Sequence, residues 1–145
     1  MTRPPALSVA VLAGIVHGAF SLYWGAGGTW LIETIGEAVT GQFAALAWVL
    51  LVIGALKLAL ALGPLLVDAP WARVLYWLGA GALILWGGLN TLTTNLMLGG
   101  VIALPEDVDR PALIGHAWIW DPLFLVWGVA LAVGLWQRRE ESRGR

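Results

Sequence analysis

The sequence predicts an all-α fold: an integral membrane four-helix bundle with both chain ends in the cytoplasm. Of the 145 residues, 59% are hydrophobic and only 12% are charged, whereas a soluble domain carries about 25% charged residues. Four apolar runs divide the chain, and each is long enough to cross a hydrocarbon core of about 30 Å. The basic residues fall mainly on one side of these runs, which sets the orientation.

The four expected spans cover about residues 6–25, 43–63, 71–92 and 113–136. In lipid, such runs form helices or closed barrels, because backbone groups find no water there. The runs lack the alternation of barrel strands, so helices are predicted. They use nearly the whole chain, which therefore forms a single domain over residues 1–145.

Arginine placement predicts the orientation. With four spans, six of the seven arginines share one side of the membrane, and only Arg110 lies on the other. The positive-inside rule then places both termini and the loop 65–70 in the cytoplasm. The outer segments 26–42 and 93–112 are acidic, and the first of them is expected to form a short interfacial helix over about residues 29–40.

Composition also indicates a source and excludes several classes of site. Arginine used in place of lysine, with abundant Ala, Gly and Leu, is typical of a GC-rich bacterial genome, so the expected location is the bacterial inner membrane, with several spans. The absence of cysteine excludes disulfides and thiol chemistry, and two histidines cannot form a three-histidine metal site. We expect no metal, no cofactor and no nucleic-acid partner.

A GxxxG element, Gly14 to Gly18, lies in the first span. Small residues at this spacing let helices approach closely. Packing inside the bundle is the favoured interpretation, and a homo-oligomer built through this face is the alternative.

Ionisable residues inside a span are costly and mark functional sites by default. His17 and Asp121 each lie about eight residues below the outer end of their spans, roughly 12 Å deep. We therefore expect them to form an acid/base pair. Lys57 lies in the inner half, where it either extends inward toward Asp68, the favoured interpretation, or reaches up toward Asp121. Pro122 removes a backbone donor and predicts a kink beside this acid.

Aromatic and polar residues surround the expected pair. Trp120, Trp127 and His116 share one face of the fourth span. This face predicts either a packed aromatic core, the favoured interpretation, or a cavity for a flat or unsaturated ligand. The candidate ligand-binding residues are Tyr23, Trp24, Trp86, Asn90, His116, Trp120 and Trp127.

Two motifs carry a family resemblance. Tyr-Trp-Gly-Ala-Gly-Gly-Thr-Trp spans residues 23–30, and Trp-Asp-Pro-Leu-Phe-Leu-Val-Trp-Gly spans residues 120–128. Together they resemble those of a family of small bacterial four-helix membrane proteins classed only as a domain of unknown function. The resemblance covers nearly the whole chain and implies no activity. It draws attention to His17, Tyr23, Trp24, Gly27, Gly28, Trp120, Asp121 and Pro122.

Three functions compete. The first is binding of a membrane lipid or a hydrophobic, isoprenoid-like small molecule in an outer-leaflet cavity near Asp121. The second is a structural or accessory membrane protein whose buried polar residues lock the bundle. The third is an oligomeric transport or channel subunit. The chain has no complete catalytic signature, so whether it is an enzyme stays open.

Overall fold

The computed structural model describes residues 4–143, except for the side chains of residues 38, 43, 44 and 46. Within that part of the chain there are helices and no strands, which confirms the predicted all-α fold. The elements are α1 (Pro5–Gly25), η1 (Ile32–Ile35), α2 (Glu37–Thr40), α3 (Phe43–Leu66), α4 (Pro70–Leu98), α5 (Arg110–Gly115), η2 (His116–Trp120) and α6 (Asp121–Arg143).

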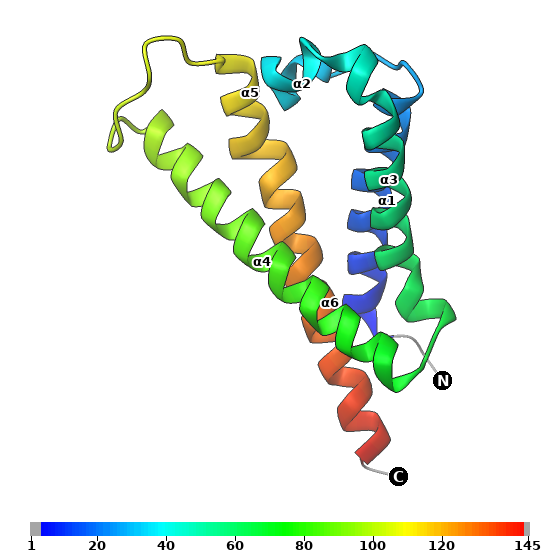
Figure 1. Ribbon diagram of the computed structural model, residues 1–145. Helices are drawn as coiled ribbons and strands as arrows, with labels where there is room; N and C mark the ends of the chain where they lie inside the picture. Colours follow the sequence, from blue (N-terminus) through cyan, green and yellow to red (C-terminus); the bar gives the residue numbers. More distant parts are fainter. Residues whose placement is uncertain (1–3, 144–145) are drawn as a thin grey trace.

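Four stretches are long and apolar enough to cross a membrane, so the chain is a multi-pass membrane protein. They are α1, most of α3, α4 and the continuous helix Arg110–Arg143, which joins α5, η2 and α6. The helices α1, α3, α4 and Arg110–Arg143 each contain one of the predicted spans, although α4 runs six residues beyond the predicted end at 92. The start of α1 and the end of α6 lie at one end of the bundle (Figure 1), which we call the terminal end.

The opposite end, the capped end, carries η1, α2 and α5 (Figure 1). The single helix expected over residues 29–40 is instead two short pieces separated by Gly36. Gly36 has a φ of 103°, which a helix cannot accommodate and which favours glycine. We call η1 and α2 together the cap.

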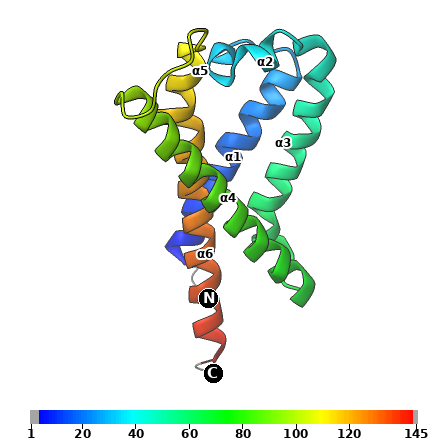
Figure 2. The same cartoon turned by 60° about the vertical axis from the view of Figure 1, so that its left-hand side comes forward.

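The spans pack as two pairs joined through a central contact. In both views α1 lies beside α3, while α4 crosses α6 (Figures 1 and 2). Contacts between α1 and α6 join the two pairs. Although α3 and α4 are consecutive in the chain, they diverge from their shared loop and touch little (Figure 2).

Glycines set the close approach of α1 to its neighbours. A Cβ on Gly14 would lie 2.5 Å from Ala61 Cβ and 2.7 Å from the Trp127 ring. A Cβ on Gly18 would lie 2.9 Å from Leu58. The GxxxG element is therefore used inside the bundle, which confirms the favoured interpretation, and its two glycines face α3 and α6 of the same chain.

The contact of α4 with α6 is equally close. Gly87 of α4 faces the backbone of α6, because its Cβ would lie 2.5 Å from Leu125 N and 2.6 Å from the Asp121 carbonyl oxygen. In return, a Cβ on Gly128 of α6 would lie 2.9 Å from the Ala80 carbonyl oxygen of α4. Two helix backbones thus meet almost directly beside Asp121, as small residues allow in membrane helices.

Candidate functional site

A hydrogen-bonded group of three side chains lies where α1 packs on α3. The Lys57 ammonium donates to Ser21 Oγ at 2.9 Å and lies 3.0 Å from His17 Nδ1. Because an ammonium only donates, Nδ1 accepts, and we infer from this network that the ring proton of His17 is on Nε2. Nε2 is buried and has no partner among the described residues. One donor of His17 is therefore left open inside the membrane span.

Phe124 of α6 completes the surroundings of this group. The His17 ring stacks on Phe124 with centroids 3.7 Å apart, and Lys57 Nζ lies 5.1 Å from the centroid of the same ring. Within residues 4–143, no carboxylate lies within ion-pair distance of Lys57. An imidazole, a hydroxyl and an aromatic face therefore surround the ammonium.

The expected inward extension of Lys57 toward Asp68 is wrong. Asp68 forms an ion pair with Arg73 at 2.9 Å, whereas Lys57 bonds to two residues of α1. The physical reason is the depth of Lys57. Reaching the nearby acceptors on α1 gives two of its three donors a hydrogen-bond partner without leaving the bundle.

A π-helical turn, η2, positions the acid of the site. Pro122 has no N–H, so the regular ladder of hydrogen bonds cannot continue through it, and the turn before it is wound as His116–Trp120. Bonds from residue i to i+5 bring residues five apart toward one face. His116 Nδ1 accordingly lies 2.9 Å from Asp121 Oδ2. The predicted kink at Pro122 thus takes the form of a π-turn that pairs a histidine with the acid.

Asn95 secures this turn from the neighbouring helix. Its side-chain amide donates to the Ala117 carbonyl at 3.2 Å and to the Thr91 carbonyl at 2.8 Å. Winding a π-turn leaves backbone carbonyls in need of donors, and a buried unpaired carbonyl costs free energy. The far end of α4 therefore supports the winding of η2.

No direct hydrogen bond joins the two members of the predicted acid/base pair, both of which lie in the described part of the chain. His17 bonds to Lys57, and Asp121 bonds to His116, which lies five residues before it. Asp121 is only 1% exposed, and its second oxygen, Oδ1, has no partner among the described residues. His17 and Asp121 each keep one open hydrogen-bonding atom, of opposite type. We call His17, Ser21, Lys57, His116 and Asp121 the polar cluster.

The cap closes the capped end over this cluster. The Trp120 indole N–H donates to Thr34 Oγ1 of η1 at 2.9 Å. Asp109 holds the cap to α5, because its carboxylate accepts from Glu37 N at 2.8 Å and from Ala112 N at 3.1 Å. The acidic segments 26–42 and 93–112 are thus joined by a hydrogen-bonded carboxylate.

The first motif forms the turn that leads from α1 into the cap. Gly27 has a φ of 95°, and a Cβ on Gly28 would lie 2.4 Å or less from ring atoms of Tyr23. The Trp24 indole donates to the Trp30 carbonyl at 2.9 Å, and Trp30 N donates to the Tyr23 hydroxyl at 3.3 Å. The residues of this motif therefore fix a loop.

The predicted ligand-binding residues divide into two groups. Trp24, Trp120 and Trp127 are buried and packed, with Trp24 and Trp120 in edge contact at 5.0 Å. Trp86 is 64% exposed and Tyr23 is 44% exposed, so Trp86 does not line an internal cavity with the others. Asn90 donates to its own helix at the Trp86 carbonyl, 2.9 Å away.

The two best-defined cavities of the described residues lie at the two ends of the bundle. One, of about 720 Å³, lies at the terminal end, and the other, of about 560 Å³, lies between the cap and the segment 108–111. Asp121 lines neither of them. The expected cavity beside Asp121 is not one of these two, and the aromatic rings nearby are packed on one another: Trp120 lies edge-on to Phe20, and Phe124 stacks on His17.

Four contributors to the site were not among the predicted site residues: Ser21, Thr34, Asn95 and Phe124. Ser21 follows His17 by four residues, so helical spacing could have identified it. Phe124 lies in the second motif, three residues after Asp121, which was also a usable signal. Thr34 and Asn95 reach the site through tertiary contacts that spacing does not reveal.

Loss of the Thr34 acceptor offers a direct test of the cap. We expect Thr34→Val to lower the free energy of unfolding by about 1–2 kcal/mol, because the buried Trp120 N–H loses its partner. Thermal unfolding in mild detergent measures the change. Thr93→Val, at an exposed position of α4 with no recorded side-chain hydrogen bond, is the matched control. Equal effects of the two variants would contradict the role of Thr34.

Comparison with known proteins finds one family, whose function is unknown. A family model described as a protein of unknown function (DUF3995) matches residues 14–131. The match includes both motifs and the whole polar cluster. Neither a curated protein nor a solved structure matches the chain. Because the family model covers most of the sequence, the chain belongs to this family of proteins of unknown function.

Proposed function

We propose that this membrane protein binds the polar end of a lipid or isoprenoid-like amphiphile at the polar cluster. Ionisable side chains inside a membrane bundle are retained at a cost. Here they are held in a defined arrangement by Phe124, by a π-turn and by the cap. The composition favours the inner membrane of a bacterium as its location.

One observation carries this proposal. His17 Nε2 and Asp121 Oδ1 are buried on α1 and α6, which pack together, and neither has a partner among the described residues. Nε2 carries the ring proton and donates, whereas a carboxylate oxygen accepts. A hydroxyl group both accepts and donates, so an alcohol-bearing ligand complements the two open atoms. The two residues of the expected acid/base pair would then act through the ligand and not on one another.

His116 gives the buried acid a route to the surroundings. Its side chain is 39% exposed, while Asp121 beside it is 1% exposed. A proton accepted by Asp121 could therefore leave through the imidazole, as general acid/base chemistry requires. This connection would suit an enzyme that acts on the ligand hydroxyl as well as a binding protein.

Lipid analysis of the purified protein tests the proposal. The wild-type chain, extracted in mild detergent, should retain a hydroxyl-bearing isoprenoid or lipid above its abundance in the membrane, as measured by mass spectrometry. Asp121→Asn, which keeps the size and shape of the side chain, should lose it while keeping the unfolding temperature of the wild type. Asp107→Asn, an exposed acid with no recorded hydrogen bond, is the control. Only bulk phospholipid in the wild-type sample would overturn the proposal.

A structural role is the second candidate, and one contact favours it. Lys57 of α3 bonds to both His17 and Ser21 of α1, so it ties two helices together inside the membrane. If this lock is the main role, His17→Phe should lower the unfolding temperature and no specific lipid should be retained. Breaking such a buried group by removing one partner is strongly destabilising.

A further inference from the structure

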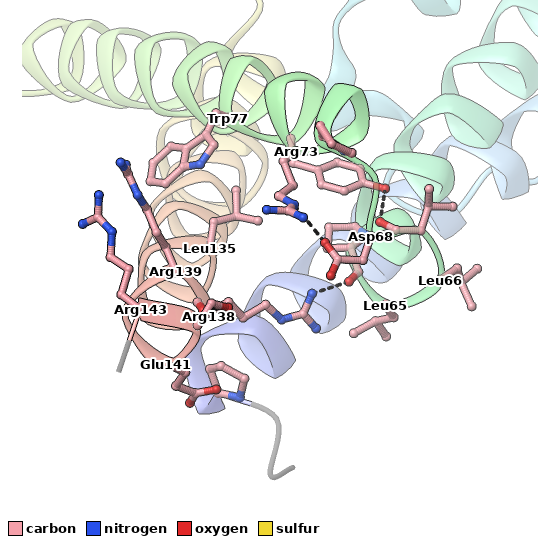
Figure 3. A pocket seen from close by; sticks show the side chains of 16 residues that line it. Leu65, Leu66, Asp68, Arg73, Trp77, Leu135, Arg138, Arg139, Glu141 and Arg143 are labelled. Atoms are coloured by element: carbon pink, nitrogen blue, oxygen red, sulfur yellow. Dashed lines mark hydrogen bonds and ion pairs between the residues drawn. The ribbon is translucent and has the colours of Figure 1, made fainter. Parts of the chain in front are cut away.

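The larger cavity lies at the terminal end, far along the bundle from the polar cluster. It is bounded by the end of α3, the loop 67–69, the start of α4 and the last turns of α6. Figure 3 shows this arrangement, with Arg73 and Trp77 entering from α4 and three arginines from α6. Four arginines and two carboxylates line the cavity, so its lining carries net positive charge.

Contacts within the chain hold its walls together. Arg138 donates to the Pro64 carbonyl, which is an open acceptor at the end of α3. The Tyr76 hydroxyl donates to the Val67 carbonyl at 3.2 Å and holds the loop. Arg73 is engaged with Asp68 at 2.9 Å. A preformed site of this kind binds without the cost of ordering its walls.

Arg139 remains for a ligand, and Arg143 can join it by exchanging a weak surface ion pair. Arg139 and Arg143 are four residues apart on α6, and Figure 3 shows both extending on the side of Trp77. Arg143 lies 3.4 Å from the exposed Glu140, and Arg139 has no ion pair within residues 4–143. Like charges at this spacing repel one another. An anion between them removes that repulsion, and a guanidinium matches the geometry of phosphate.

The rim of the cavity is apolar. Leu66 is 78% exposed, and Val67 and Trp77 are also exposed. A free phosphate ion gains nothing from such a rim, whereas a lipid would place its glycerol and acyl chains against it.

We propose that this cavity binds the phosphate headgroup of an anionic membrane lipid, with Arg139 and Arg143 holding the phosphate and Leu66 and Trp77 contacting the chains. Basic pockets between membrane helices on the cytoplasmic side take such headgroups. The positive-inside rule predicts the same side for this end of the bundle. The site is independent of the ligand proposed at the polar cluster.

Native mass spectrometry of the full chain in mild detergent tests the site, with phosphatidylglycerol or phosphatidylcholine added in equal amounts. The wild type should retain phosphatidylglycerol in preference to phosphatidylcholine. Arg139→Gln should weaken this retention about fivefold, which corresponds to the loss of one basic contact at the membrane surface. Arg110→Gln removes the same charge at the capped end, where the exposed Arg110 lines only the smaller cavity, and should change nothing.

Three results would overturn the proposal. They are equal retention of both lipids, equal weakening by Arg139→Gln and Arg110→Gln, and displacement of phosphatidylglycerol by millimolar inorganic phosphate. The last would indicate a site for a soluble anion. Asp121→Asn should leave phosphatidylglycerol retention unchanged, so failure at the polar cluster is distinguishable from failure here.

Discussion

Trp127→Ala is expected to destabilise the protein by about 3–5 kcal/mol, the range for removing a large aromatic side chain from a packed interior. Trp127 is 0% exposed and lies against Gly14 of α1, at the meeting point of α1, α3 and α6. In a membrane, packing of this kind drives helix association, because burial from water contributes little between helices. Thermal unfolding in mild detergent, followed by near-UV circular dichroism, measures the loss.

Trp118→Ala is the matched control for this variant. Trp118 lies nine residues earlier on the same continuous helix and is 68% exposed. It should cost under about 0.5 kcal/mol, as for a surface substitution. A stable Trp127→Ala protein that loses a bound lipid would contradict the packing role and return Trp127 to the ligand-binding residues predicted from sequence.

Helix positions were predictable because membrane spans are set by one-dimensional properties. The length and hydropathy of each run decide whether it crosses the bilayer. The small-residue spacing of the GxxxG element predicted a helix contact, which the structure confirms. Pro122 predicted a kink, and the structure shows a π-turn over His116–Trp120 just before it. The expected helix over residues 29–40 starts later than predicted, because Leu31 has a left-handed φ of 58°, and it is interrupted at Gly36, whose φ of 103° ends the first piece.

The partners of the buried polar groups were not predictable in this way. His17 and Asp121 were placed at equal depth, but depth says nothing about rotation around the helix axis. The π-turn before Asp121 changes the direction of this side chain, because it adds a residue to the turn. As a result, the hydrogen-bond partner of Asp121 is His116, and the partner of His17 is Lys57. Trp86 shows the same limit of prediction from depth. Its depth suited a cavity-lining residue, but its side chain faces outward.

The close contact between α4 and α6 holds the fold together and lies beside Asp121. We therefore expect Gly87→Ala, at this contact, to lower the stability of the protein strongly. The added Cβ would lie 2.5 Å from Leu125 N and 2.6 Å from the Asp121 carbonyl oxygen. These are backbone atoms, which cannot move aside as a flexible side chain can. Overpacking of this kind costs about 1–3 kcal/mol, measured as a lower unfolding temperature in mild detergent.

Gly81→Ala separates this effect from helix propensity. Gly81 is on the same helix, and a Cβ there would meet nothing within 4 Å. Alanine favours a helix over glycine by up to about 1 kcal/mol, so Gly81→Ala should be neutral or stabilising. If Gly87→Ala were equally harmless, α4 and α6 could not pack as closely as they do. Gly87 faces the backbone of Asp121 itself. Moving α4 away from α6 should therefore also weaken retention of the ligand proposed for the polar cluster.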